Sequence, residues 1–81
     1  MDRHSLRTAL LAAGLPPESF QLAGVHEATD RPTDFWFMRP APAGGWELGS
    51  YERGRFEVRE THATESAAAR RLYEILVPPV G

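Results

Sequence analysis

The sequence contains no cysteine, no lysine and no long hydrophobic run. Without cysteine, neither a disulfide framework nor a thiolate metal site can form, and small secreted domains usually depend on such cross-links. The apolar stretch from Ala9 to Leu15 is short and includes Gly14, so it is a poor signal peptide. No stretch approaches the roughly 18 apolar residues of a membrane span. We therefore expect a cytoplasmic protein.

Excess positive charge is also lacking, since nine arginines face eleven acidic residues and the formal charge is -2. Affinity for nucleic acid rises with the number of neutralised phosphates and needs a basic stripe. The densest arginines are Arg53, Arg55 and Arg59, and glutamates interleave with them. The local field largely cancels, so we expect no nucleic-acid partner.

With 81 residues the chain is long enough for one compact domain, residues 1–81. A domain of this size buries only about 60–65% of its unfolded surface. A deep substrate cavity would remove much of the packing that holds it together. The length therefore favours a surface function.

The first half of the sequence predicts a helix and two strands. Apolar residues at helical spacing indicate a helix over Ser5–Ala13, which Gly14 and the following prolines end. Extended segments are expected at Glu18–Val25 and Asp34–Arg39, separated by a polar loop at His26–Thr33. The glycine-rich segment Ala41–Gly45 predicts a turn.

The second half predicts a hairpin and a helix. Alternating segments that begin at Trp46 and run to Arg59 are joined by the turn Tyr51-Glu52-Arg53-Gly54. Thr64 is a good N-cap for a final amphipathic helix that covers the apolar face of the sheet. The predicted fold class is α+β, with an N-terminal helix, a three- to four-stranded antiparallel sheet of one apolar and one charged face, and a C-terminal helix packed on the sheet.

No arrangement of residues indicates catalysis or metal binding. His4, His26 and His62 lack a recognisable nucleophile or orienting partner, and the segment His26–Asp30 lacks the spacing of a zinc site. Glu52 and Glu57 could form a carboxylate pair, but the neighbouring arginines favour salt-bridged surface carboxylates. We expect a protein that is not an enzyme and has no cofactor and no metal.

The aromatic residues indicate an interaction surface. Phe35 and Phe37 point to the side of their strand opposite Trp36 and Met38. If helices cover one face, one of these pairs is exposed, and an outward Trp36 near Tyr51 would form an aromatic and arginine patch of the kind that dominates protein interfaces. If the two helices cover opposite faces, both pairs are buried.

Several short motifs resemble small immunity proteins of bacterial polymorphic toxin systems, in particular those encoded beside toxins with a TNT-type NAD-glycohydrolase domain. The motifs are Gly14-Leu15-Pro16, the loop around Gly24, Tyr51-Glu52-Arg53-Gly54 after a Trp-containing strand, Thr64-Glu65-Ser66-Ala67-Ala68, and the terminal Leu72-Tyr73-x-Ile75-Leu76 helix. The resemblance spans nearly the whole chain, although the segments His26–Asp34 and Ala41–Gly45 have their own character.

The resemblance implies a cytoplasmic antitoxin that binds a cognate protein toxin, an NAD-hydrolysing enzyme in that group, and occludes its active site without chemistry of its own. The expected partner-binding residues are the aromatic, arginine and acidic side chains of the central strands: Trp36, Arg39, Trp46, Tyr51, Glu52, Arg53 and Arg55. The alternative is a small regulatory or accessory module without catalytic activity that forms a homodimer through the same sheet face.

Overall fold

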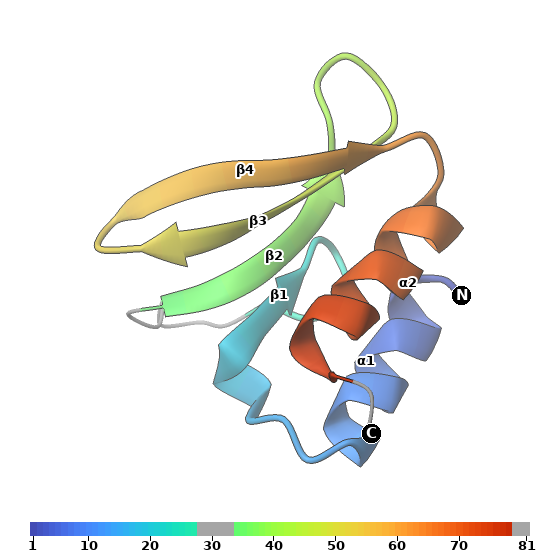
Figure 1. The fold of residues 1–81 in the computed structure, drawn as a ribbon, viewed down its shortest axis with the longest axis vertical. Helices are drawn as coiled ribbons and strands as arrows, with labels where there is room; N and C mark the ends of the chain where they lie inside the picture. The colour runs from blue at the N-terminus through green and yellow to red at the C-terminus, as the bar shows by residue number, and fades with distance from the viewer. Residues whose placement is uncertain (28–33, 79–81) are drawn as a thin grey trace.

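The computed structural model describes residues 1–27 and 34–78. They form two α-helices, one 3₁₀ turn and four strands, in the order α1 (Arg3–Ala12), η1 (Pro17–Ser19), β1 (Phe20–Leu22), β2 (Asp34–Pro40), β3 (Trp46–Glu52), β4 (Arg55–His62) and α2 (Glu65–Leu76). The strands form one sheet in the order β1-β2-β3-β4 (Figure 1). The α+β prediction is therefore confirmed.

Both helices lie on the same side of the sheet (Figure 1). We call this side the inner face and the opposite side the outer face. Leu6 and Leu10 of α1 and Leu72 of α2 are fully buried in one cluster with the inward residues of the strands, among them Met38 and Leu48. The two helices therefore share one core, and the alternative in which they cover opposite faces is wrong.

The sheet is mostly antiparallel, but β1 pairs with β2 in parallel. The register places Phe20 beside Trp36 and Leu22 beside Met38. Residues that are directly paired in a sheet share a face. The short parallel strand therefore adds two fully buried side chains to the core beneath the helices, and the expectation of a wholly antiparallel sheet is wrong at this edge.

The helix boundaries follow their capping residues. Asp2 accepts a hydrogen bond from the backbone N–H of Ser5 (2.8 Å), so α1 begins two residues before the predicted Ser5. Thr64 accepts a hydrogen bond from the backbone N–H of Ala67 (3.1 Å) and caps α2 as predicted. The expected strand at 18–25 is reduced to the three residues of β1, and of the expected loop His26–Thr33 residues 28–33 lie outside the described residues.

The two aromatic pairs of β2 lie on opposite faces of the sheet, and Trp36 is not on the outer face, where the exposed-patch hypothesis requires it. Trp36 is half-buried and packs against the inner core, as Met38 does. Phe35 and Phe37 lie on the outer face and form a second cluster with Tyr51. An outward Trp36 is wrong because the register with β1 aligns Trp36 with Phe20 beneath the helices.

The prediction of one apolar and one charged face is also wrong. On β4, Phe56 and Val58 pair with Tyr51 and Gly49, so they lie on the outer face with the aromatic residues. Arg55 and Glu57 pair with Glu52 and Ser50 on the inner side. The hairpin formed by β3 and β4 extends past the helices in Figure 1, so these charged side chains need not enter the core.

No helix within residues 1–27 and 34–78 is long and apolar enough to cross a membrane.

Candidate functional site

The candidate site is the turn end of the β3–β4 hairpin. Glu52 and Arg55 are paired across a two-residue loop made of Arg53 and Gly54. Both loop residues have positive φ, 51° at Arg53 and 80° at Gly54, as a type I′ turn requires. Arg53 is the one non-glycine residue with positive φ in the described part of the chain. The turn is thus tight, and an arginine holds the position that asparagine, aspartate or glycine usually occupies.

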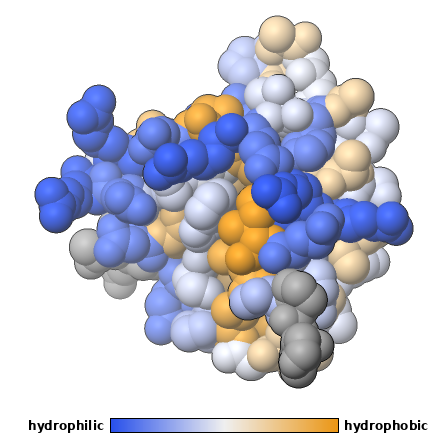
Figure 2. Space-filling view, in the orientation of Figure 1, coloured by the Kyte–Doolittle hydropathy of each residue, from blue (hydrophilic) through white to orange (hydrophobic). Residues whose placement is uncertain are grey.

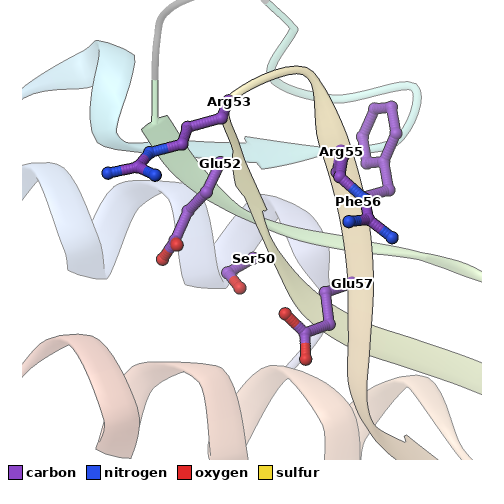
Figure 3. Close-up of a pocket in the computed structure, with 6 residues that line it drawn as sticks. All are labelled: Ser50, Glu52, Arg53, Arg55, Phe56 and Glu57. Carbon is purple, nitrogen blue, oxygen red and sulfur yellow. The ribbon is translucent and has the colours of Figure 1, made fainter.

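Five polar or charged residues surround this turn, and we call them the hairpin-tip site: Ser50, Glu52, Arg53, Arg55 and Glu57. With Phe56 they line an open concavity of about 530 Å³. Figure 3 shows the oxygen atoms of Glu52, Ser50 and Glu57 on one side of the hairpin, the side toward the helices, and the Phe56 ring on the other side. Three of the seven predicted partner-binding residues, Glu52, Arg53 and Arg55, meet here.

Three of these charged side chains have no partner in the described part of the molecule. Glu52, Arg53 and Arg55 are exposed, and none of their side chains makes a hydrogen bond or ion pair with a residue in 1–27 or 34–78. Several other arginines are paired with carboxylates, for example Arg3 with Glu65 (2.8 Å) and Arg71 with Glu60 (3.0 Å). The tip therefore presents charges that intramolecular contacts do not neutralise.

A cluster of rings supports the hairpin immediately behind its tip. We call Phe35, Phe37, Tyr51 and Phe56 the outer cluster. Tyr51 stacks on Phe35 with 4.7 Å between ring centroids and lies 4.7 Å from Phe56, and Phe37 meets Phe56 edge-on at 5.3 Å. Phe35 and Phe37 are only 3% exposed. Such ring pairs fix side-chain geometry, so the tip is carried on a rigid base.

Two predicted partner-binding residues, Arg39 and Tyr51, belong to this base rather than to the tip. The Arg39 guanidinium lies 4.6 Å from the centroid of Phe37 and 5.0 Å from that of Phe56, and it forms an ion pair with Glu47. Glu47 is 7% exposed, so its carboxylate depends on this partner. Arg39 therefore stabilises the outer cluster and compensates a buried charge.

Trp46 lies at the other end of β3, where it pairs with Pro40 and His62. The Arg3 guanidinium stacks over its ring at 4.9 Å and donates a hydrogen bond to the carbonyl oxygen of Ala23 (2.6 Å). This arrangement joins α1 to the sheet. Trp46 thus lies at the end of β3 opposite the hairpin tip.

Trp36 contributes to a second hollow beside the tip. This hollow has a volume of about 230 Å³ and is lined in part by Leu15, Trp36 and Leu76. It shares Ser50 and Glu52 with the hairpin-tip site, so the two form one continuous surface. Figure 2 shows hydrophilic side chains over the hairpin and an apolar strip down the centre of this side. The charged hairpin-tip site and the more apolar hollow therefore lie next to each other on the surface.

Two of the three histidines, His26 and His62, have structural partners. His62 lies 3.0 Å from Glu60, which also accepts from Arg71. The hydrogen bond from His62, reinforced by Arg71, holds the pKa of Glu60 below its usual range. His26 stacks on Phe20 at 4.4 Å and its Nε2 contacts the carbonyl oxygen of Pro17. Within the described ranges, no group of three or more His, Cys, Asp or Glu residues could hold a metal ion.

The sequence interpretation missed Ser50 and Glu57 as members of the hairpin-tip site. Ser50 is 4% exposed and accepts a hydrogen bond from Arg59 (3.3 Å), so it lies at the floor of the concavity. The sequence could have indicated both residues, because a two-residue loop closed by Glu52 and Arg55 places Ser50 opposite Glu57 two positions further along the hairpin.

Comparison with protein-family models, curated proteins and solved structures finds no match for this chain.

Proposed function

We propose that this protein is a cytoplasmic immunity protein that binds a cognate bacterial toxin and inserts the hairpin-tip site into the toxin's active-site entrance. The sequence motifs that resemble immunity proteins supply the class of partner, and an NAD-hydrolysing toxin is the partner that the resemblance implies. The hairpin geometry supplies the binding element. Inhibition by occlusion requires no reaction in the inhibitor, only a rigid surface complementary to the target.

The observation that carries this proposal is Arg53, which occupies the left-handed region in the two-residue loop of the β3–β4 hairpin. A side chain without local backbone hydrogen bonding pays roughly 1–2 kcal/mol for that conformation. Asparagine or glycine would fit the turn at lower cost. Backbone strain of this kind clusters at binding sites. An arginine in this position supports a role in recognition rather than in folding.

The chemistry of the tip suits an enzyme entrance. Two arginines present planar guanidinium groups that bind carboxylates or phosphates through paired hydrogen bonds. Glu52 and Glu57 lie beside them and repel a surface with the opposite arrangement of charge. The adjoining hollow with Trp36 and Leu76 offers apolar area for an anchor residue of the toxin.

Co-expression tests this proposal. The tagged protein should co-purify in a stoichiometric complex with the product of a neighbouring toxin gene, and it should restore growth to cells that this toxin alone kills. Arg53→Ala and Arg55→Ala should each weaken binding at least about thirtyfold if they are central anchors. Arg70→Ala is the matched control, because Arg70 is also exposed and has no ion pair within the described residues.

The same binding measurements distinguish, among the seven predicted partner-binding residues, those that contact the partner from those that stabilise the fold. Trp46→Ala should lower stability with little specific effect on binding, since Trp46 lies at the opposite end of β3 beneath Arg3. Equal losses of affinity at Arg53, Arg55 and Arg70 would show that the hairpin tip is not the binding element. Absence of both a complex and toxicity would remove the immunity role altogether.

A further inference from the structure

The hollow that Trp36 lines beside the hairpin tip also contains two acidic residues, Asp34 and Glu52. They are directly paired across β2 and β3, so both side chains lie on the inner face of the sheet. Both are exposed, and neither side chain makes a hydrogen bond or ion pair within residues 1–27 and 34–78. Like charges directly opposite one another destabilise a sheet. The pair therefore lacks a counter-charge in the described part of the chain.

The end of α2 adds to the negative potential of this hollow. Leu76 is the last residue of α2 and lines the hollow. The C-terminal end of a helix carries a partial negative charge, roughly half an elementary charge. The last turn of α2 contains no basic residue, and the described residues that line the hollow include no arginine and no histidine. The hollow thus favours a cation.

The apolar part of the hollow has room for one side chain. Leu15, Trp36 and Leu76 are half-buried and form its apolar wall. Its volume of about 230 Å³ is below the roughly 300–1,000 Å³ of sites for small molecules. Arginine and lysine bury an apolar stem and keep a charged head near polar groups. A basic side chain therefore matches both parts of the hollow.

The paired carboxylates favour arginine over lysine. Side chains that are paired across adjacent strands have Cβ atoms about 4.5–5.5 Å apart. A guanidinium group is a planar fork with five donors and can bind two such carboxylates together, whereas an ammonium group is a compact, strongly hydrated point charge. Trp36 lies two positions from Asp34 on the same face of β2, and a guanidinium also stacks on indole rings. These features together match arginine.

We infer that this hollow is the binding site for an arginine side chain of the protein partner. The stem of the arginine packs on Trp36 and Leu76, and its guanidinium group binds the carboxylates of Asp34 and Glu52. The inference rests on the proposed function in that the partner is a protein, and it names the residue by which that protein is anchored. Charge complementarity carries it, because the hollow joins two carboxylates and a helix C-terminus to an apolar wall. Glu52 also lines the hairpin-tip site, so the anchor holds the partner beside the tip.

Two model compounds test the inference without the toxin. They are N-acetyl-arginine N-methylamide and its citrulline counterpart, in which a neutral urea group replaces the guanidinium group at nearly the same shape. Each is titrated into the ¹⁵N-labelled protein by NMR. The arginine compound should bind with a dissociation constant in the millimolar range, as expected for so small a ligand. The citrulline compound should bind about tenfold more weakly, because it loses about threefold for each of two exposed charge pairs. Shift changes should centre on the amides of Asp34 and Glu52 and on the indole N–H of Trp36.

Variants locate the contact. The double variant Asp34→Asn, Glu52→Gln should abolish the difference between the two compounds. Glu74→Gln is the matched control and should retain the difference, because Glu74 is also exposed but lines another surface hollow. The double variant removes a pair of like charges, so its Tm should be no lower than that of the parent protein, as measured by circular dichroism. Asp34→Asn alone should weaken the arginine compound about threefold, which keeps the test decisive if the double variant does not fold.

Three results would overturn the inference. They are equal binding of the two compounds, a preference for arginine that survives the double variant, and a dimer of the protein alone that Asp34→Asn dissociates in sedimentation, since a second copy would then occupy the hollow. The outcome is separable from that of the proposed function. Toxin neutralisation through Arg53 with equal binding of the two compounds refutes the arginine site alone. A clear preference for the arginine compound without a toxin complex refutes the immunity role alone.

Discussion

Replacement of Arg53 by asparagine should make the protein more stable, because it would convert the loop into Asn-Gly, the preferred sequence for a type I′ turn. Arg53 has a φ of 51° and its side chain makes no hydrogen bond or ion pair with a described residue, so the substitution relieves strain without the loss of such a contact. Asparagine tolerates the left-handed region because its short side chain can hydrogen-bond locally. A gain at an exposed position therefore has a specific conformational cause.

The magnitude follows from the cost of the left-handed conformation. Part of the roughly 1–2 kcal/mol is recovered, so we expect a gain of about 0.5–1 kcal/mol in the free energy of unfolding. For a domain of this length that corresponds to a rise in Tm of about 2–8 °C. Urea denaturation and thermal unfolding followed by circular dichroism measure both quantities.

Arg55→Asn is the matched control. It removes the same charge from a neighbouring exposed residue, but it lies within β4, where asparagine is a poor strand former. We expect no gain, and a loss within about 0.5 kcal/mol. If Arg53→Asn is no more stable than the parent protein, or if both variants gain equally, the strain argument is wrong and Arg53 loses its standing as a residue retained for recognition.

Two further predictions concern stability. Gly49→Ala should destabilise the fold by about 1–3 kcal/mol in urea denaturation, because a Cβ would overlap the Glu57 carbonyl oxygen and the Phe37 ring, whereas Gly54→Ala should cost about 1 kcal/mol, its Cβ meeting nothing closer than 3.9 Å. Hydrogen bonds from the Arg3 side chain and backbone hold the pKa of Glu65 below its usual 4.5, so their stabilisation is complete above pH 4.5 and disappears as the pH falls through the lower folded value. Unfolding free energies measured between pH 7 and 3 should decline less steeply in Glu65→Gln; an unchanged slope would contradict that assignment.

The elements that were predictable from the sequence are those set by local signals. Thr64 caps α2 where its side chain reaches Ala67, and the short loop with Gly54 fixes the register of β3 and β4. These features depend on residues within a few positions of each other, so periodicity and turn chemistry suffice to find them. The α+β class, the final helix and the hairpin were recoverable for that reason.

The assignment of faces was not predictable, because it depends on pairing between segments distant in the sequence. An alternating strand gives no sign of which side faces the helices, and a shift of one residue exchanges the two faces. The parallel register that aligns Phe20 with Trp36 decides the matter, and it joins residues sixteen positions apart. The two tryptophans consequently moved from the expected interface to the core side, while Phe56 moved to the outer face.

The division of the seven candidate residues has a consequence for how tightly the tip can bind. A binding loop that must be ordered on association loses affinity, whereas a two-residue turn backed by the stacked rings of Phe35, Tyr51 and Phe56 is already fixed. The ordering cost that remains is that of the exposed side chains, roughly 0.5–1.5 kcal/mol for each immobilised arginine. Truncating a ring of the outer cluster should therefore weaken partner binding indirectly, without removing a contact with the partner, because the backbone that carries Arg53 becomes less ordered. Tyr51→Ala tests this step: a loss of affinity together with a loss of order at the tip in NMR relaxation supports it, and a rigid tip with unchanged affinity contradicts it.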